Sequence, residues 1–457
     1  MTIDMQVFKQ FAEQIPHLGE RAQPPQMADH KRVSAAKETF VRKLDARMAV
    51  DLESCIHCGH CASACHFYVG TEDPKYVPIR KLDLLKRVYR RELSPLRWLH
   101  RLYTDDITLK ELQEWQELVY DSCTECGRCS MVCPMGINIA GMVNVMRQGM
   151  ARAGMMPAEL MAMEQEQGVH DSLFGVGPEQ MKGAIMQLQQ SGLDIPLDKH
   201  DADILVTTSV IDIMLFTDGL IATAKILNHL GLNWTLRSDG YEAANFGLLS
   251  GCERVQKIAS ERIVLAARAC GAKTVLIPEC GHAYPSMRWE AANEHGGKLP
   301  FEVLAISEFL GREVKAGRLK LNPMGREKKI TYHDPCKLAR HSGAIEEPRW
   351  VLDALGVDFR EVESNKELNW CCGGGAGVFL INSASELRQK AFEIKMGQVE
   401  KTGADSVVTA CGSCRLNFMN GSMRSGWDKG IESLVEIVAE ALPVQQSSEP
   451  AKQTTAS

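Results

Sequence analysis

The chain has 457 residues, of which 45% are hydrophobic and 24% charged, and its net charge is −6. This length exceeds what one hydrophobic core organises, so we expect two or three domains, and the acidic balance argues against a nucleic-acid partner. The N-terminal residues do not have the apolar core of a secretory signal, so we expect a reducing compartment. In such a compartment the sixteen cysteines are expected to be metal ligands rather than disulfides.

The first two hundred residues are expected to be helical. Residues 1–50 are predicted to form a charged arm that leads into the first cysteine cluster. Residues 51–150 carry eight cysteines in two clusters, separated by the amphipathic stretch RKLDLLKRVYRRELSPLRWLHRLY, and we interpret them as a helical iron–sulfur domain. Residues 151–200 are rich in Met, Gln and Gly and are expected to be a helical connector whose methionines serve packing.

The eight cysteines of the helical domain follow the spacing of two ferredoxin-type motifs. Each cluster has the order C-x2-C-x2-C-x3-C, in which three cysteines of one motif and the fourth of the other hold one cubane cluster. Zinc also uses C-x2-C pairs, but it has no need of a third and fourth cysteine in this order. The predicted ligand sets for two 4Fe-4S cubanes are Cys55, Cys58 and Cys61 with Cys133, and Cys123, Cys126 and Cys129 with Cys65.

From residue 201 onward, short β-rich runs alternate with helical stretches. The runs DILVTTSV, KTVLIPE, KKITYHD and DSVVTAC predict an α/β domain with largely parallel strands. Segments of the first half resemble segments of the second, so we expect two copies of one unit, residues 201–322 and 323–443. The first copy carries Asn245 and Phe246 at or within one residue of the positions of Cys371 and Cys372. The polar tail, residues 444–457, is expected to be disordered.

Three loops of the second copy contain five cysteines: Cys336, the adjacent pair Cys371 and Cys372, and Cys411 with Cys414. If each loop follows a strand, all five meet at the carboxyl edge of the sheet, where open α/β sheets place their sites. Gly373, Gly374 and Gly375 permit a sharp turn and a close approach of backbone to a cofactor. Five thiolates exceed what one cubane needs, which favours an atypical iron–sulfur centre. Zinc, or an ordinary cubane with a spare cysteine, is the alternative.

The arrangement C-x34-CCG-x37-CxxC, preceded by two ferredoxin-type motifs, resembles the heterodisulfide reductase catalytic subunits. The resemblance extends from about residue 50 to residue 440, and IPECGHAY in the first copy is similar to the D-type subunit and to the K subunit of the sulfite-reductase-associated membrane complex. It implies an α-helical ferredoxin-type domain followed by an α/β domain of two CCG repeats, the first degenerate. It also implies a noncubane 4Fe-4S centre held by Cys336, Cys371, Cys372, Cys411 and Cys414.

By this resemblance the chain is an enzyme subunit. It would carry electrons through two cubanes to or from the noncubane centre, which acts on a disulfide or a protein-bound sulfur substrate. A departing thiolate needs a proton, and His282, His333 and His341 are candidates because they lie in neighbouring motifs. Of these, His282 and His333 are the predicted catalytic residues. The purely structural interpretation of His333 is that it ends a strand ahead of a helix cap.

The alternative function is that of an electron-transfer subunit, because CCG domains also occur in flavin-dependent 2-hydroxy acid and glycerol-3-phosphate dehydrogenases. One complete and one degenerate copy with ECGHAY favours the disulfide-cleaving group. No dinucleotide fingerprint is present, so the expected partners are other redox subunits, either a membrane cytochrome or quinone-reactive subunit or a cytosolic flavoprotein. The most apolar stretch, 204–222, contains two aspartates, so we expect a cytoplasmic chain that is peripheral on the membrane through a partner subunit.

Overall fold

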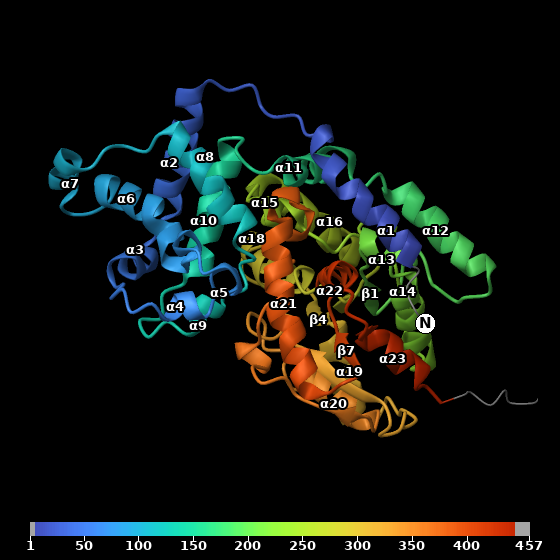
Figure 1. Ribbon diagram of the computed structural model, residues 1–457. Coiled ribbons are helices and arrows are strands. Elements are labelled where there is room, and N and C mark those ends of the chain that lie inside the picture. Colours follow the sequence, from blue (N-terminus) through green and yellow to red (C-terminus); the bar gives the residue numbers. More distant parts are fainter. Residues whose placement is uncertain (1–4, 444–457) are drawn as a thin grey trace, which may run out of the picture.

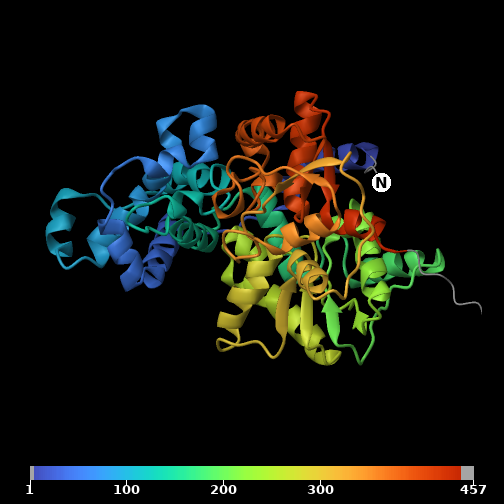
Figure 2. The same cartoon turned by 90° about the horizontal axis from the view of Figure 1, so that it is seen from below.

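The computed structural model describes residues 5–443, so the predicted disorder of residues 444–457 lies outside the described part. A helical domain, blue to teal in Figure 1, lies beside a larger α/β region that runs from green to red. Figure 2 shows that this region consists of two units side by side, one green to yellow and one orange to red.

The N-terminal arm forms two separate helical parts. α1 (Met5–Gln14) and the 3-10 helix η1 (Ile15–Arg21) lie against the α/β side, where Phe8 and Phe11 are buried. After an extended link, α2 (Asp29–Lys43) packs on α10 (Ile139–Arg152) of the helical domain. The Phe40 ring occupies the space that a Cβ at Gly149 would need. The arm therefore connects both halves of the molecule.

The helical domain is built around the buried faces of short helices. Its core includes Phe67, Leu85, Val119 and Met146. The amphipathic stretch between the cysteine clusters is not one helix, because the chain turns at Ser94 and Pro95, and a proline cannot donate the helical hydrogen bond. The helices are α3 (Ala46–Glu53), α4 (His60–Ser63), α5 (His66–Thr71), α6 (Asp83–Glu92), α7 (Arg97–Tyr103), α8 (Leu109–Gln116), α9 (Arg128–Met131) and α10.

Two further helices, α11 (Ala158–Gln165) and α12 (Pro178–Gln190), lead into the α/β region. Met161 and Met163 of α11 are buried, which agrees with the expected role of this methionine-rich segment in packing.

The α/β region contains two four-stranded parallel sheets with equivalent strand orders, β2-β1-β3-β4 and β6-β5-β7-β8. Every pairing within them is parallel, so the predicted parallel α/β architecture is confirmed. The strands are β1 (Ile204–Val206), β2 (Trp234–Thr235), β3 (Thr274–Ile277), β4 (Glu302–Ala305), β5 (Lys329–His333), β6 (Asp358–Phe359), β7 (Ser406–Thr409) and β8 (Gly430–Ser433).

Helices cover these sheets and join the two units. The first unit contains α13 (Val210–Met214), α14 (Thr217–His229), α15 (Phe246–Ser250), α16 (Glu253–Ala269), α17 (Ala283–Pro285), α18 (Ala292–Glu294) and α19 (Ile306–Lys315). The second contains α20 (Glu347–Ala354), α21 (Ser385–Thr402), α22 (Gly412–Ser425) and α23 (Leu434–Glu440). Because α19 packs on α20 and α14 on α23, one apolar core runs through both units.

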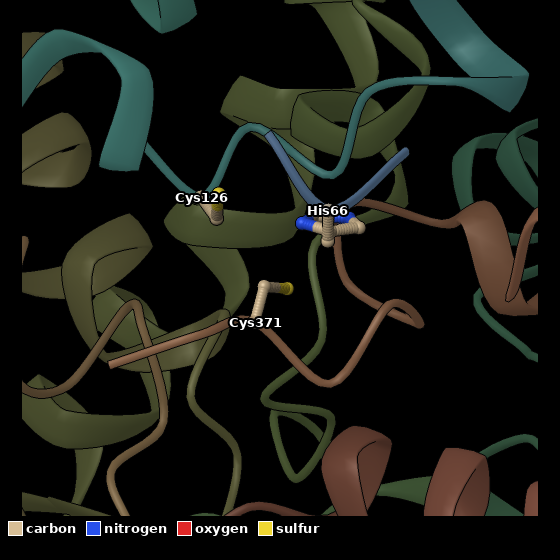
Figure 3. Close-up of side chains that lie close together, drawn as sticks. All are labelled: His66, Cys126 and Cys371. Carbon is tan, nitrogen blue, oxygen red and sulfur yellow. The ribbon is translucent and has the colours of Figure 1, made fainter. Parts of the chain in front are cut away.

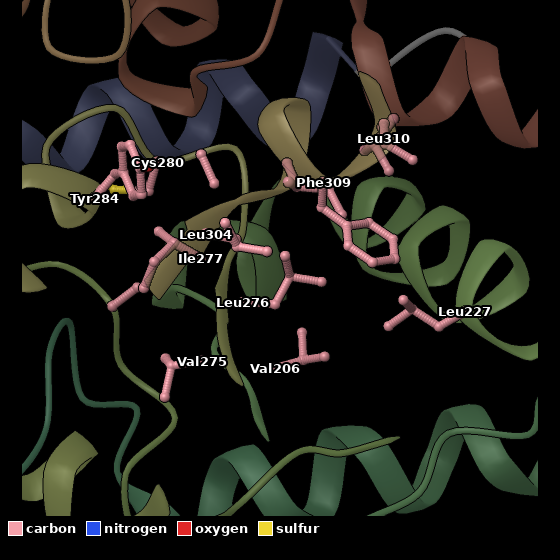
Figure 4. Packing of buried hydrophobic residues seen from close by; sticks show 14 of the residues in the cluster. Val206, Leu227, Val275, Leu276, Ile277, Cys280, Tyr284, Leu304, Phe309 and Leu310 are labelled. Atoms are coloured by element: carbon pink, nitrogen blue, oxygen red, sulfur yellow. The ribbon is translucent and has the colours of Figure 1, made fainter. Parts of the chain in front are cut away.

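Apolar strand residues form this core. In Figure 4, Val206, Leu276 and Leu304 from three strands lie near Leu227 and Phe309 from the covering helices. Burying each such side chain contributes about 1.5–3 kcal/mol. The second unit is also fixed to the helical domain, because α21 packs on α5.

Candidate functional site

Three loops of the second α/β unit bring five thiols together at the carboxyl ends of β5, β6 and β7. Side-chain contacts connect them in the order Cys336, Cys371, Cys372, Cys414 and Cys411. None of the five is more than 7% exposed. Such a dense group of buried thiols has few uses other than metal coordination.

The adjacent cysteines are held by the backbone that follows them. The amides of Gly373 and Gly374 donate to the sulfurs of Cys371 and Cys372, each at 3.4 Å. Gly373 has a φ of 98°, and an added Cβ would lie 2.6 Å from the Cβ of Ala391. Glycine is therefore required at position 373 for both conformation and space.

The third glycine of the run has a different environment. A Cβ at Gly375 would be 3.5 Å from the carbonyl oxygen of Thr124, which is an ordinary contact. Gly375 thus lies where the second unit meets the helical domain, and its backbone needs no left-handed conformation.

His333 faces the thiol cluster in a defined tautomer. A ring nitrogen lies within 4.8 Å of the sulfurs of Cys372 and Cys414. The side-chain amide nitrogen of Asn369 donates to His333 Nδ1 at 3.3 Å, so the proton of the neutral ring is on Nε2. Burial lowers the pKa of His333. Hydrogen bonds from Cys371, Cys414 and His333 hold the pKa of Cys372 well below its usual value.

Lys395 supports this arrangement from α21. Its ammonium group donates to Asn369 Oδ1 and, at 2.9 Å, to Gln398 Oε1. The Asn369 amide nitrogen also donates to the carbonyl of Asp334 at 2.5 Å, so both ends of this amide are fixed. Lys395 is fully buried, and burial lowers its pKa to about 8. Sequence reasoning missed Lys395, because a lysine within a long charged helix is typical of a solvated face.

A cavity with an empty volume of about 1010 Å³, which includes open solvent, lies between the two α/β units. The second unit contributes four of the five cluster cysteines to its wall, and the first unit contributes Cys280 and His282. Phe11 of the N-terminal arm and the half-buried Lys337 also line it. The remaining lining is largely apolar, with side chains such as Phe246 and Leu416.

His282 lies on the wall of this cavity with one ring nitrogen already occupied. Its Nε2 is 3.0 Å from the carbonyl oxygen of Asn245, and because a carbonyl only accepts, Nε2 is the donor. Burial lowers the pKa of His282 to about 4. Burial also raises the pKa of the neighbouring thiol of Cys280. The loop touches the cluster, because a Cβ on Gly281 would be 3.1 Å from the Cys411 sulfur.

The cysteines of the helical domain form two separate groups. The Cys61 thiol interacts with those of Cys55 and Cys133, and burial raises its pKa. Cys58 is the exposed member of this motif. In the other group, the pKa of Cys129 is raised well above its usual value. Burial is the main cause, and the nearby thiols of Cys126, Cys65 and Cys123 add to it. Each group contains thiols of one predicted ligand set.

The second cubane motif meets the five-thiol cluster directly. The sulfurs of Cys126 and Cys371 and a ring nitrogen of His66 lie within 4.8 Å of one another (Figure 3). Thr124 Oγ1 is 3.4 Å from the Cys371 sulfur. Arg340 of the second α/β unit also connects to the helical domain, because its guanidinium donates a hydrogen bond to the carbonyl oxygen of Cys126 at 2.7 Å. Neither the motif spacing nor the local pattern could have revealed this contact.

Comparison with known proteins identifies both parts of this site. Residues 51–137 match the 4Fe-4S dicluster domain, and residues 330–419 match the cysteine-rich domain CCG. The chain is 30% identical over 415 residues to the D-type subunit of the Dihydromethanophenazine:CoB--CoM heterodisulfide reductase of Methanosarcina acetivorans, covering 88% of this chain and 96% of that protein. The chain belongs to the family of D-type heterodisulfide reductase subunits. The predicted resemblance is thereby confirmed.

Other relatives of this D-type family member are components of redox systems. It is 28% identical to the Hdr-like menaquinol oxidoreductase iron-sulfur subunit 2 of Archaeoglobus fulgidus, over 84% of this chain and 78% of that protein. It is 25% identical to the EtfAB:quinone oxidoreductase of Syntrophomonas wolfei, over 81% and 55% respectively. The chain is therefore an iron–sulfur electron-transfer subunit of the heterodisulfide reductase type, and the dehydrogenase alternative is not favoured. Between residues 5 and 443, no helix has the length and hydrophobicity needed to span a membrane.

Proposed function

We propose that this subunit reduces or forms a sulfur–sulfur bond in a disulfide or a protein-bound sulfur substrate, in the cavity between its two α/β units. When bound, two cubanes would supply electrons singly, and a noncubane 4Fe-4S centre would offer iron as a partner for substrate sulfur. The observation that carries this proposal is that four of the five buried thiols face a cavity whose wall also includes Cys280 and His282 of the first α/β unit. A cubane that only relays electrons is complete with four thiolates, so the fifth thiol favours a centre with a further role.

The donor set fits a group larger than a zinc ion. A structural zinc site is complete with four ligands, whereas here a fifth thiol belongs to the same chain of contacts. The backbone amides of Gly373 and Gly374 add donors for negatively charged sulfur. We therefore assign Cys336, Cys371, Cys372, Cys411 and Cys414 to one iron–sulfur centre.

The groups in the helical domain support the proposed division of cubane ligands. Cys61 interacts with Cys133 of the other motif, and Cys129 interacts with Cys65. This crossing of the fourth cysteine is the arrangement expected for two adjacent cubanes.

We further infer that residues 201–322 are a degenerate copy of residues 323–443. The equal order of strands in the two sheets supports this inference. The first copy has Asn245 where the second has its cysteine pair, and the Asn245 carbonyl accepts a hydrogen bond from His282. The copy without the thiols would thus act as the opposite wall of the substrate cavity.

The two candidate histidines suit different roles. His333 holds its proton on Nε2, away from Asn369, and a ring nitrogen lies within 4.8 Å of the Cys372 sulfur, so the ring can donate a hydrogen bond to a thiolate of the cluster. His282 has its N–H engaged with Asn245, and its low pKa keeps the ring neutral. We assign His333 to stabilising a thiolate by a hydrogen bond from its N–H, and we assign His282 to orienting substrate through Nδ1.

The experiment that tests the function is electron paramagnetic resonance of the anaerobically purified, oxidised protein, with and without candidate disulfides. A paramagnetic signal that depends on a disulfide supports substrate binding at the five-thiol centre. Identical spectra across a panel of small disulfides and persulfidated carrier proteins, from a preparation with all its iron, would reject it.

A further inference from the structure

Helix α7 carries an unpartnered apolar face at the outer tip of the helical domain (Figure 1). Among the residues that the structure describes, none on α7 is buried. Large hydrophobic side chains are concentrated there, with Trp98 66% exposed, Leu102 70% and Tyr103 80%. Leu93 and Leu96, just before the helix, are exposed as well. Contiguous exposed apolar groups of this kind mark interaction sites.

Polar contacts help to hold α7 in position. Arg101 pairs with Glu92 at 2.5 Å and donates to the carbonyl of Arg91 at 3.1 Å. The Arg91 guanidinium donates to the carbonyl of Thr104. The helix is thus fixed to the end of α6, while Trp98, Leu102 and Tyr103 remain exposed. The protein keeps these side chains exposed at a fixed position.

The segment is basic, although the chain as a whole is acidic. Residues 84–103 contain six lysine and arginine side chains and one carboxylate, in a protein with a net charge of −6. Within the described residues, neither Arg97 nor Lys86 forms an ion pair, and Arg97 is exposed beside Trp98. An anionic surface would complement this charge.

Helical spacing puts the apolar and basic groups in neighbouring rows. Trp98 and Leu102 are four residues apart and share one face, and Arg97 and Arg101 form the adjacent row. Tryptophan, tyrosine and arginine on one short helix are typical of the membrane interface, where aromatic rings lie at headgroup level and arginine reaches phosphate. A stable protein interface buries about 800 Å² per partner, which is more than one seven-residue helix offers.

We propose that α7 is a membrane-docking helix that inserts Trp98, Leu102 and Tyr103 into the interface of a bilayer containing anionic lipids. Docking would hold the more exposed cubane motif near the membrane, because Arg90 of α6 pairs at 2.9 Å with Glu53, two residues before Cys55. This proposal does not depend on which sulfur substrate the cavity accepts.

Flotation of the full-length, iron-loaded protein tests the proposal. Vesicles of phosphatidylcholine alone are compared with vesicles that also contain phosphatidylglycerol. We expect the protein to float with the anionic vesicles and to be released by salt. The double variant Trp98→Glu/Leu102→Glu should reduce the bound fraction at least about tenfold, because each change removes an inserted apolar group and adds a repelled charge. Leu265→Glu, at a position 55% exposed on α16, is the matched control and should float normally.

A second measurement locates the inserted side chain. Lipids brominated in the acyl chains should quench part of the tryptophan fluorescence of the wild type, and Trp98→Phe should lose that part while still floating. The proposal would be overturned if the wild type did not float with the anionic vesicles or if the double variant floated like the wild type. It would also be overturned if the lipids quenched the fluorescence of Trp98→Phe as much as that of the wild type. Iron content and circular dichroism of every variant exclude misfolding as the cause of lost binding.

Discussion

The thiol sulfur of Cys126 in the helical domain lies within 4.8 Å of the thiol sulfur of Cys371 in the second α/β unit. The two proposed ligand sets therefore share a boundary, and His66 and Thr124 complete it. No additional carrier is needed between the second cubane site and the five-thiol site. The other cubane set includes the exposed Cys58, so it is the natural entry point for a redox partner.

This order of sites gives a first prediction. Cys126→Ser should remove a ligand of the second cubane, and reduction of a disulfide by an artificial donor that acts at the first cubane should slow at least about tenfold. The five-thiol centre should remain assembled, as judged by its paramagnetic signal. Cys252→Ser, a cysteine outside every proposed set, is the control. Full activity in Cys126→Ser would mean that electrons reach the cavity by another route.

The second prediction concerns stoichiometry. Anaerobic reconstitution should give about twelve irons per chain, because three sites would each hold four. Iron and acid-labile sulfide are measured on the same sample together with protein concentration. A value near eight would remove the five-thiol centre from the proposal and leave only the two cubanes.

Regular patterns in the sequence predicted much of the architecture. β1, β3, β5 and β7 are apolar runs in the interior of their sheets, and all four were expected. The edge strands β2 and β6 have only two residues each, which is too short for any periodicity. The repeated cysteine spacing likewise predicted the iron–sulfur character of the helical domain, because the spacing within each motif is a local property.

The rest of the site depends on contacts between distant segments. Asn369 fixes the His333 tautomer because Lys395, on another helix, donates to the amide oxygen and so leaves the amide nitrogen facing the ring. Nothing near residue 395 distinguishes this lysine from a solvated one. The closeness of Cys126 to Cys371 follows from docking α5 against α21, which no single motif encodes.

A third prediction tests the junction between domains. Arg147 is fully buried and donates to the carbonyls of Cys123 at 2.7 Å, Leu249 at 2.9 Å and Ala376 at 2.7 Å. It therefore joins the helical domain and both α/β units. Arg147→Met should destabilise the protein by about 3–5 kcal/mol, because several buried carbonyls lose their donor.

Chemical denaturation followed by circular dichroism measures this effect as a lower midpoint. Arg152→Met is the matched control, since Arg152 ends the same helix and is exposed, and its midpoint should change little. Equal midpoints for the two variants would show that Arg147 is not a structural junction.

A fourth prediction addresses the cavity. Lys337 is half-buried on its wall and forms no ion pair within residues 5–443. Lys337→Gln should therefore raise KM for disulfides that carry a carboxylate or sulfonate, by about tenfold, and leave kcat similar. A neutral disulfide of the same size serves as the control substrate. An equal change with both substrates would assign Lys337 to packing instead of recognition.

The fifth prediction isolates the adjacent cysteine pair. Cys372→Ala should abolish disulfide reduction while both cubanes still accept electrons, because all proposed cubane ligands precede residue 134. Four thiols remain in the cluster, enough for an ordinary cubane, so iron content should change little. Cys270→Ala, a fully buried thiol in the first unit, is the control for removing a buried sulfur and should keep its activity. If Cys372→Ala turns over a disulfide at the normal rate, the pair is not part of the catalytic centre and the chain only transfers electrons.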